Sequence, residues 1–300
     1  MMKAKARKML LLSPGQILLS LSMMLFVLVV LVPLLNILAR SISDPTRSAS
    51  MNGLDILPQG LSTLNYRIIF GHKVIVPSIF NSLRITLIGT AINIILTTTA
   101  AYVLIQKKLV GRKAIMTFLI VMMLFDPGLV PEYLVIKDLG LIGSHWSIIL
   151  VTAVNVYYLI IMMRYFEAIP AEMYEAARID GAGHLRTLAA IVFPLARPGI
   201  ATITMFYAVA RWNEYFKASI YLTQQAKTTL QVVLRQFVVL SDTVNLIGPQ
   251  NLAEYNEFAR VDYTALKSAT IVVAIIPILL LYPLVLKYYT SDIMAGGVKG

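Results

Sequence analysis

The chain has 300 residues, of which 58% are hydrophobic and only 14% are charged, and its mean hydropathy is +0.76. Soluble domains carry about 25% charged residues, so this composition excludes an ordinary soluble domain and indicates a polytopic membrane protein. The net charge of +11 is typical of Lys and Arg retained on the cytoplasmic side of a membrane, and we do not read it as nucleic-acid binding. With no Cys and three widely separated His, the chain offers no disulfide framework, thiol nucleophile or metal-ligand spacing.

Six apolar stretches are each long enough to cross a bilayer as a helix of roughly 20 residues. We therefore predict an all-α protein in which residues 1–300 form a single transmembrane domain. The first stretch is too long for a signal peptide and no convincing cleavage pattern follows it, so we expect a retained helix. The spans are expected at about residues 17–39, 83–105, 114–135, 145–163, 200–222 and 268–286.

The basic residues set the expected orientation of these spans. If the N-terminus is cytoplasmic, the short inner segments contain clusters of Lys and Arg, whereas the short outer segment 131–144 has only Lys137. Positive charge favours the cytoplasmic side, so we predict a multi-pass membrane protein with both termini in the cytoplasm. The inner cations are Lys107, Lys108, Arg112, Lys113, Arg164, Arg178, Arg186 and Arg197.

The polar segment between the fourth and fifth spans reads as a helix–turn–helix. Pro170 suits a first helical position, and Gly181 with Gly183 permits a reversal of the chain. A second short helix over 184–193 is expected to be stopped by Pro194 and Pro198. Glu175 and Arg178 are three residues apart and can pair on one helix face, while the small side chains of Ala176 and Ala177 allow a partner to approach closely. We call residues 165–198 the coupling segment.

The spacing in this segment resembles the loop that identifies permease subunits of bacterial ATP-driven (ABC) importers. That family's pattern is Glu-Ala-Ala, three residues, Gly, nine residues, then Ile-x-Leu-Pro. It is matched here at Glu175, Ala176, Ala177, Gly181, Ile191 and Pro194, and Phe193 replaces the usual Leu. The resemblance implies a six-helix permease of the type I importer class whose cytoplasmic loop docks an ATPase.

Further residues resemble the carbohydrate branch of this family. They include the run from Pro131 to Leu141 and the C-terminal residues Gly296, Val298, Lys299 and Gly300. The resemblance implies a second permease subunit, two ATPase subunits that bind ATP and Mg, an extracytoplasmic solute-binding protein and an oligosaccharide substrate. Acidic, alginate-like oligosaccharides are favoured by the similarity and by the outer-half cations Arg211, Lys217, Arg235 and Arg260, although a neutral sugar stays open.

Polar residues inside the spans are candidates for the translocation pathway. Arg211, Trp212, Asn213 and Glu214 lie 12 to 15 positions into the fifth span, roughly 18–22 Å along a helix, where charges usually face a cavity or partner. Trp212 can stack on a sugar ring while Asn213 and Glu214 bind hydroxyls, or the group can serve interhelical packing with Arg211 paired to Glu214. Pro127 and Gly128 are expected to weaken the third span next to Asp126, which is either another pathway residue or part of a helix kink.

No motif in the chain supports catalysis. There is no Gly-x-x-x-x-Gly-Lys-Ser/Thr phosphate loop, no Gly-x-Ser-x-Gly elbow and no His-Glu-x-x-His zinc pair. We therefore expect no catalytic, metal or cofactor-binding residue in this chain, and ATP hydrolysis by partner subunits. Two other classes remain: an ion-driven secondary transporter, which would need no ATPase, and a membrane-embedded enzyme, which would need a catalytic constellation that we do not find.

Overall fold

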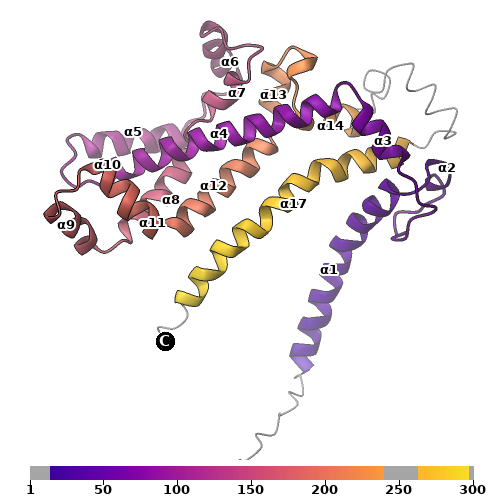
Figure 1. The fold of residues 1–300 in the computed structure, drawn as a ribbon, viewed down its shortest axis with the longest axis horizontal. Helices are drawn as coiled ribbons and strands as arrows, with labels where there is room; N and C mark the ends of the chain where they lie inside the picture. Colours follow the sequence, from indigo (N-terminus) through magenta and orange to yellow (C-terminus); the bar gives the residue numbers. More distant parts are fainter. Residues whose placement is uncertain (1–13, 240–262, 297–300) are drawn as a thin grey trace, which may run out of the picture. The chain divides into compact units, whose positions relative to one another are not determined.

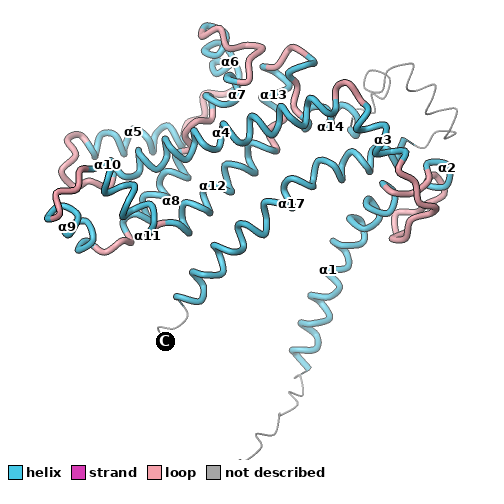
Figure 2. The backbone as a smooth tube through the Cα atoms, in the orientation of Figure 1, coloured by secondary structure: helices cyan, strands magenta, loops and turns pink. Residues whose placement is uncertain are grey.

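The structure is a computed structural model that describes residues 14–239 and 263–296. The described residues form helices joined by loops, with one isolated antiparallel bridge between Ser43 and Leu61 (Figure 2). This confirms the all-α class. The elements in chain order are α1 (Pro14–Ser41), α2 (Pro45–Ser48), α3 (Leu64–Gly71), α4 (Ile75–Leu104), α5 (Arg112–Leu124), α6 (Leu129–Asp138), α7 (Trp146–Val151), α8 (Val156–Glu167), α9 (Ala171–Ile179), α10 (His184–Thr187), the π-helical turn η1 (Leu188–Val192), α11 (Phe193–Leu195), α12 (Arg197–Trp212), α13 (Phe216–Tyr221), the 3-10 turn η2 (Gln225–Lys227), α14 (Leu230–Leu234), the π-helical turn η3 (Arg235–Val239) and α17 (Tyr263–Gly296).

The described residues fall into two compact units. The first unit contains α1, the loop that follows it and the start of α17 as far as Val272. The second unit begins at Phe70 and contains the helices α4 to α14 together with the rest of α17. The coupling segment and every candidate pathway residue therefore lie in the second unit.

Three helices are individually long and apolar enough to cross a membrane: α1, α4 and residues 263–280 of α17. Two further pairs of helices pass the same test only when taken together, and each pair is sharply bent. The described residues thus hold three such helices, or up to five if each bent pair is one span. The count of six spans stays a prediction.

The third expected span, 114–135, is not a continuous helix. α5 ends at Leu124, α6 begins at Leu129, and their axes differ by 115°. Pro127 supplies no backbone N–H, and Gly128 has φ +80°, which a residue with a side chain rarely adopts. The Asp126 Oδ1 accepts a hydrogen bond from the Gly128 N at 2.8 Å, which fixes the turn. The break therefore falls at Pro127 and Gly128, where the sequence predicts a weakened or kinked helix.

The fourth and fifth expected spans are interrupted as well. Between α7 and α8 the chain unwinds, and the Asn155 Oδ1 caps α8 by accepting a hydrogen bond from the Tyr158 N at 3.1 Å. After α12 the chain unwinds again, and the Glu214 Oε1 accepts from the Lys217 N at 2.9 Å at the start of α13. Polar side chains that cap helices explain both breaks, which hydropathy does not detect.

The second unit is organised around α4, which packs against α12 and α8 (Figure 1). Its buried face carries small and polar residues at helical spacing, which lets neighbouring helices approach closely and supplies hydrogen-bonding groups. An apolar cluster from α4, α8, η1 and α12 covers the half of α4 nearer its C-terminus. The buried polar residues of this face are Ser78, Ser82, Thr86, Thr90, Asn93, Thr97 and Thr98.

Candidate functional site

The first half of the coupling segment is a short helix closed by a glycine turn. The helix α9 begins at Ala171, with Pro170 as the residue before its first turn. At its end, the Ala182 N donates to the Ala177 O at 2.9 Å and the Gly181 N donates to the Arg178 O at 3.1 Å. This pair of bonds is a Schellman motif. Gly181 has φ +71°, so the motif uses the freedom of glycine and places the turn where the sequence predicted it.

The second half of the segment departs from the prediction. Pro194 does not stop the helix, because helical structure continues through α10, η1 and α11 to Leu195. Over Leu188–Val192 the helix widens to π geometry. A proline lacks the N–H for an ordinary helical bond and its ring crowds the carbonyl four residues earlier, and a π turn just before it relieves both constraints. The bend of 87° comes after Leu195, where α12 begins.

One face of the coupling segment is fixed to the neighbouring helices. Leu188, Val192 and Ala196 are buried in the same cluster as Met163 and Phe166 of α8. The Tyr174 hydroxyl donates to the Phe166 O at 2.9 Å. Burial, with a smaller contribution from the nearby Tyr102 ring, raises the pKa of Tyr174 to about 12. This tyrosine is therefore a neutral donor near pH 7.

A single polar contact joins the coupling segment to α4. The Tyr102 hydroxyl and the His184 Nδ1 share a hydrogen bond of 3.3 Å. The two rings meet edge to face, with centroids 6.0 Å apart. Tyr102 is buried near the C-terminal end of α4, so this contact links α10 to that end of α4.

The other face of the segment is open. Glu175 and Ala176 are exposed, whereas Ala177 is only 2% exposed and packs inward. Glu175 and Arg178 could pair by their spacing, but no ion pair joins them within the described part of the chain, and both side chains are exposed. Beside the glycine turn, Ile179 is 86% exposed and Leu185 is 80% exposed. Their exposure marks an unpartnered apolar surface that our reading of the sequence missed.

The second candidate region centres on Arg211 of α12, which is 5% exposed. Its Nε donates to the Asn93 Oδ1 at 3.0 Å. Its Nη atoms donate to three backbone carbonyls at the end of α7: Ile148 O at 2.5 Å, Ile149 O at 2.7 Å and Thr152 O at 3.0 Å. A cation at a helix C-terminus satisfies the last carbonyls of that helix and is favoured by its dipole. Arg211 therefore fastens α7 to α12.

Asn93 and Tyr207 extend this network. The Asn93 Nδ2 donates to the Thr152 O at 2.6 Å and the Ala153 O at 2.7 Å. Asn93 of α4 and Arg211 of α12 therefore both bind carbonyls at the break between α7 and α8. The Tyr207 hydroxyl accepts from the Asn155 N at 3.0 Å and shares a bond of 2.8 Å with the Thr97 hydroxyl. The break between α7 and α8 is thus fixed from α4 and from α12.

The other pathway candidates have different environments. Trp212 is 2% exposed and its Nε1 donates to the Ala274 O at 3.1 Å, so its ring is covered in this conformation. Asn213 is exposed and its Nδ2 donates to the Val209 O at 2.9 Å. Glu214 is half-buried and caps α13. Arg211 hydrogen-bonds to Asn93 and to carbonyls, and no ion pair joins it to Glu214 among the described residues.

A small cavity of about 130 Å³ brings Arg211 and Glu214 together with polar and aromatic side chains. Trp212, Asn213 and Asp126 are not among its lining residues. Our sequence analysis did not identify the other residues that line this cavity, although Tyr and Asn side chains inside apolar spans could have indicated them. The cavity is lined by Thr152, Asn155, Tyr158, Tyr207, Ala210, Arg211 and Glu214. Across the described ranges, no group of three or more His, Asp or Glu is arranged to hold a metal.

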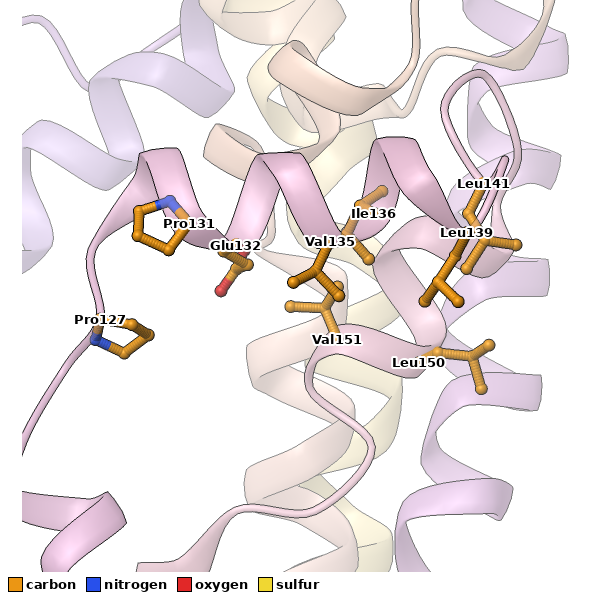
Figure 3. A pocket seen from close by; sticks show the side chains of 9 residues that line it. All are labelled: Pro127, Pro131, Glu132, Val135, Ile136, Leu139, Leu141, Leu150 and Val151. Atoms are coloured by element: carbon orange, nitrogen blue, oxygen red, sulfur yellow. The ribbon is translucent and has the colours of Figure 1, made fainter.

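A larger cavity of about 370 Å³ lies between α6 and α7. It is lined mostly by apolar side chains, and Figure 3 shows Val135 of α6 facing Val151 of α7. Glu132 is the charged residue in its wall. The Glu132 carboxylate accepts from the Lys217 Nζ at 2.7 Å and from the Tyr221 hydroxyl at 2.5 Å, so it ties α6 to α13.

The chain is similar to known membrane transport components over most of its length. The model of the family described as "Binding-protein-dependent transport system inner membrane component" matches residues 82–294. The polygalacturonan/rhamnogalacturonan transport system permease protein YtcP of Bacillus subtilis is 38% identical over 279 residues, covering 93% of this chain and 96% of YtcP. The melibiose/raffinose/stachyose import permease protein MelC of the same organism is 31% identical over 250 residues, covering 82% of this chain and 84% of MelC.

A solved structure agrees with this match. A chain from the crystal structure of a bacterial ABC transporter involved in the import of the acidic polysaccharide alginate superimposes with a TM-score of 0.85 at 31% identity. The alignment covers 92% of this chain and 96% of that chain. The fold and sequence together define a membrane permease component. The chain belongs to the family of inner membrane components of binding-protein-dependent transport systems, as the resemblance of the coupling segment implied.

Proposed function

We propose that this chain is one of two permease subunits of an ATP-driven importer of oligosaccharides. It forms half of the translocation pathway with a second, different permease and docks one of two ATPase subunits. The coupling segment and both termini then lie in the cytoplasm, and an extracytoplasmic solute-binding protein delivers the sugar. The family match, the relatives named as sugar permeases and the absence of an ATP-binding motif in the sequence support this proposal.

The observation that carries the docking proposal is the two-sided character of the coupling segment. Its inner face is buried against α8 and α4, while Ile179 and Leu185 stand almost fully exposed on either side of the Gly181 turn. Large apolar side chains beside a rigid turn are suited to fill a pocket on a partner. The exposed Glu175 adds an anion that can accept a charge-assisted hydrogen bond.

The docking proposal is tested by replacing Leu185 with Asp in the assembled transporter. We expect the ATPase subunits to be lost during purification, because a buried unpaired charge opposes the interface. Val110→Asp is the matched control, since Val110 is 92% exposed in the segment between α4 and α5, which lies on the same side of the proposed topology but outside the coupling segment. Equal recovery of ATPase with both variants would contradict the proposal.

For the substrate, we infer acidic oligosaccharides built from uronic acids. The named substrates of YtcP and of the aligned alginate transporter support this class. Of the outer-half cations that favoured an acidic substrate, Arg211 holds α7, Lys217 pairs with Glu132, and the Arg235 guanidinium lies 4.8 Å from the centroid of the Tyr215 ring. Arg260 lies outside the described residues.

The substrate class is tested with the complete transporter in liposomes together with its binding protein. Oligogalacturonates should stimulate ATP hydrolysis several-fold more than neutral galactosides of equal length. MelC favours the neutral alternative because its named substrates are neutral sugars, and equal or greater stimulation by neutral galactosides would select it. Uptake that follows an ion gradient and needs no ATP would instead identify a secondary transporter.

A further inference from the structure

The loop after α1 exposes an unusual number of large apolar side chains. Leu54 is 79% exposed, Ile56 is 47% exposed and Leu57 is 75% exposed. They flank Asp55, and we call residues 52–58 the loop tip. Apolar side chains scattered singly over a surface need no explanation, whereas three within four residues indicate a contact.

The loop has a defined fold. At its base, an isolated bridge pairs Ser43 with Leu61, and the Asp44 N donates to the Gly60 O at 2.9 Å. Inside the loop, the Ser50 hydroxyl donates to the Gln59 Oε1 at 2.9 Å. Its ends are thus closed and its interior is hydrogen-bonded, as in a compact Ω-loop. Contacts within the chain therefore fix the conformation of the loop that carries the tip.

Hydrogen bonds hold the tip against the side of α1. The Asn36 Nδ2 donates to the Asn52 O at 2.8 Å and to the Asp55 O at 2.7 Å. The Arg40 Nε donates to the Asn36 Oδ1 at 3.1 Å, and an Nη of Arg40 donates to the Met51 O. Asn36 is five residues before the end of α1 at Ser41, so the tip is drawn back by roughly 7.5 Å along the helix axis.

At this depth the side chains of α1 are those of a membrane span. Leu34, Leu35 and Leu38 are 50%, 41% and 46% exposed on the same part of the helix. The tip therefore lies at the same level along the helix axis as these exposed apolar side chains. Its polar backbone is satisfied where it turns, because Asn36 and Arg40 bind its carbonyls and the Asp55 carboxylate accepts from the Asn52 N at 2.6 Å. Backbone at membrane depth requires such satisfaction.

We propose that the loop tip inserts Leu54, Ile56 and Leu57 into the lipid leaflet beside α1, where they contact acyl chains near the headgroup boundary. In this arrangement the tip anchors the N-terminal helix laterally, as interfacial apolar residues do in other membrane proteins. The orientation in our proposed function makes this the outer leaflet. The depth of the tip along α1 follows from its hydrogen bonds to Asn36 and Arg40 and does not depend on that orientation.

The test uses a nitroxide attached to a single Cys, which the Cys-free chain permits without prior substitutions. Leu57→Cys is labelled in the assembled transporter in liposomes, without binding protein. Collision with membrane-soluble oxygen and with a water-soluble nickel chelate is then compared. Leu31→Cys in α1 is the lipid control, and Ala49→Cys, an exposed residue in the same loop outside the tip, is the water control.

We expect the Leu57 label to favour oxygen as the Leu31 label does, while the Ala49 label favours the nickel chelate. Adding Asn36→Ala should shift the Leu57 label toward the chelate, because the tip loses its two bonds to α1. A Leu57 label that favours the chelate overturns the proposal. A label shielded from both reagents also overturns it, since a protein partner then covers the tip. Either result leaves transport, and hence the proposed function, intact.

Discussion

Both the Arg211 cluster and the coupling segment are fastened to α4, but by contacts of different strength. Arg211 uses four charge-assisted hydrogen bonds, which reach Asn93 and three carbonyls. The coupling segment has one polar contact with α4, the 3.3 Å bond between Tyr102 and His184, and otherwise apolar packing. A buried charge tolerates little displacement, whereas apolar surfaces can slide. We therefore expect the Arg211 cluster to stay fixed and the coupling segment to be able to shift against α4.

The largest effect is expected from removing the Arg211 cation. Arg211→Met removes the guanidinium donors of the Ile148 and Ile149 carbonyls and leaves Ile148 with only the 3.4 Å bond from the Thr152 hydroxyl. A buried carbonyl without a donor costs about 1–3 kcal/mol. We expect a folding defect, seen as a large fall in the thermal unfolding temperature of the purified protein. Arg211→Lys should be intermediate, because an ammonium cannot reproduce the guanidinium fork. A fully stable Arg211→Met variant that loses only transport would show that Arg211 serves the sugar.

A smaller but still clear loss of stability is expected at the junction between the two regions. A Cβ on Gly199 would lie 2.3 Å from the Tyr165 ring, so Gly199→Ala overpacks the crossing of α8 and α12 at a cost of about 1–3 kcal/mol. Thermal unfolding measures this loss. Adding Tyr165→Leu should recover part of it, and no recovery would mean that the ring contact is not the cause.

The coupling turn should respond to a change in backbone strain. Gly181→Val places a β-branched residue at φ +71°, which costs about 1–3 kcal/mol and displaces the Schellman turn. We expect the protein to insert in the membrane but to lose sugar-stimulated ATP hydrolysis in the assembled transporter. Gly183→Val is the control, because Gly183 has φ −69° and open space at its Cβ. Normal hydrolysis in the Gly181 variant would refute the role of the turn.

The weakest effect should come from the contact between Tyr102 and His184. Tyr102→Phe removes one neutral hydrogen bond, which contributes about 1 kcal/mol, and keeps the ring packing. We expect near-normal stability with a lower ratio of sugar transported to ATP hydrolysed. An unchanged ratio would mean that α4 follows the coupling segment through apolar contact alone.

The two regions also differ in how far the sequence predicts them. Gly181 could be predicted because a Schellman motif is local: its partners, Ala177 and Arg178, lie within four residues. The role of Arg211 could not be predicted in this way, because its acceptors at Ile148 and Ile149 lie on a helix that is distant in sequence. Hydropathy located the apolar stretches but not the break at Asn155, which depends on a local side-chain cap. The break in the third span could be predicted, because Pro127 and Gly128 both weaken a helix. The six-span count and the pathway roles of Asp126, Trp212, Asn213 and Glu214 stay predictions.

The central claim is that the open face of the coupling segment contacts an ATPase. It is tested most directly by attaching a short photo-crosslinker to Leu185→Cys in the assembled transporter, with Val110→Cys as the matched exposed position. The account predicts an adduct between this chain and an ATPase subunit from position 185, with little or none from position 110. No adduct from position 185 in any nucleotide state, in a complex that hydrolyses ATP normally, would contradict it.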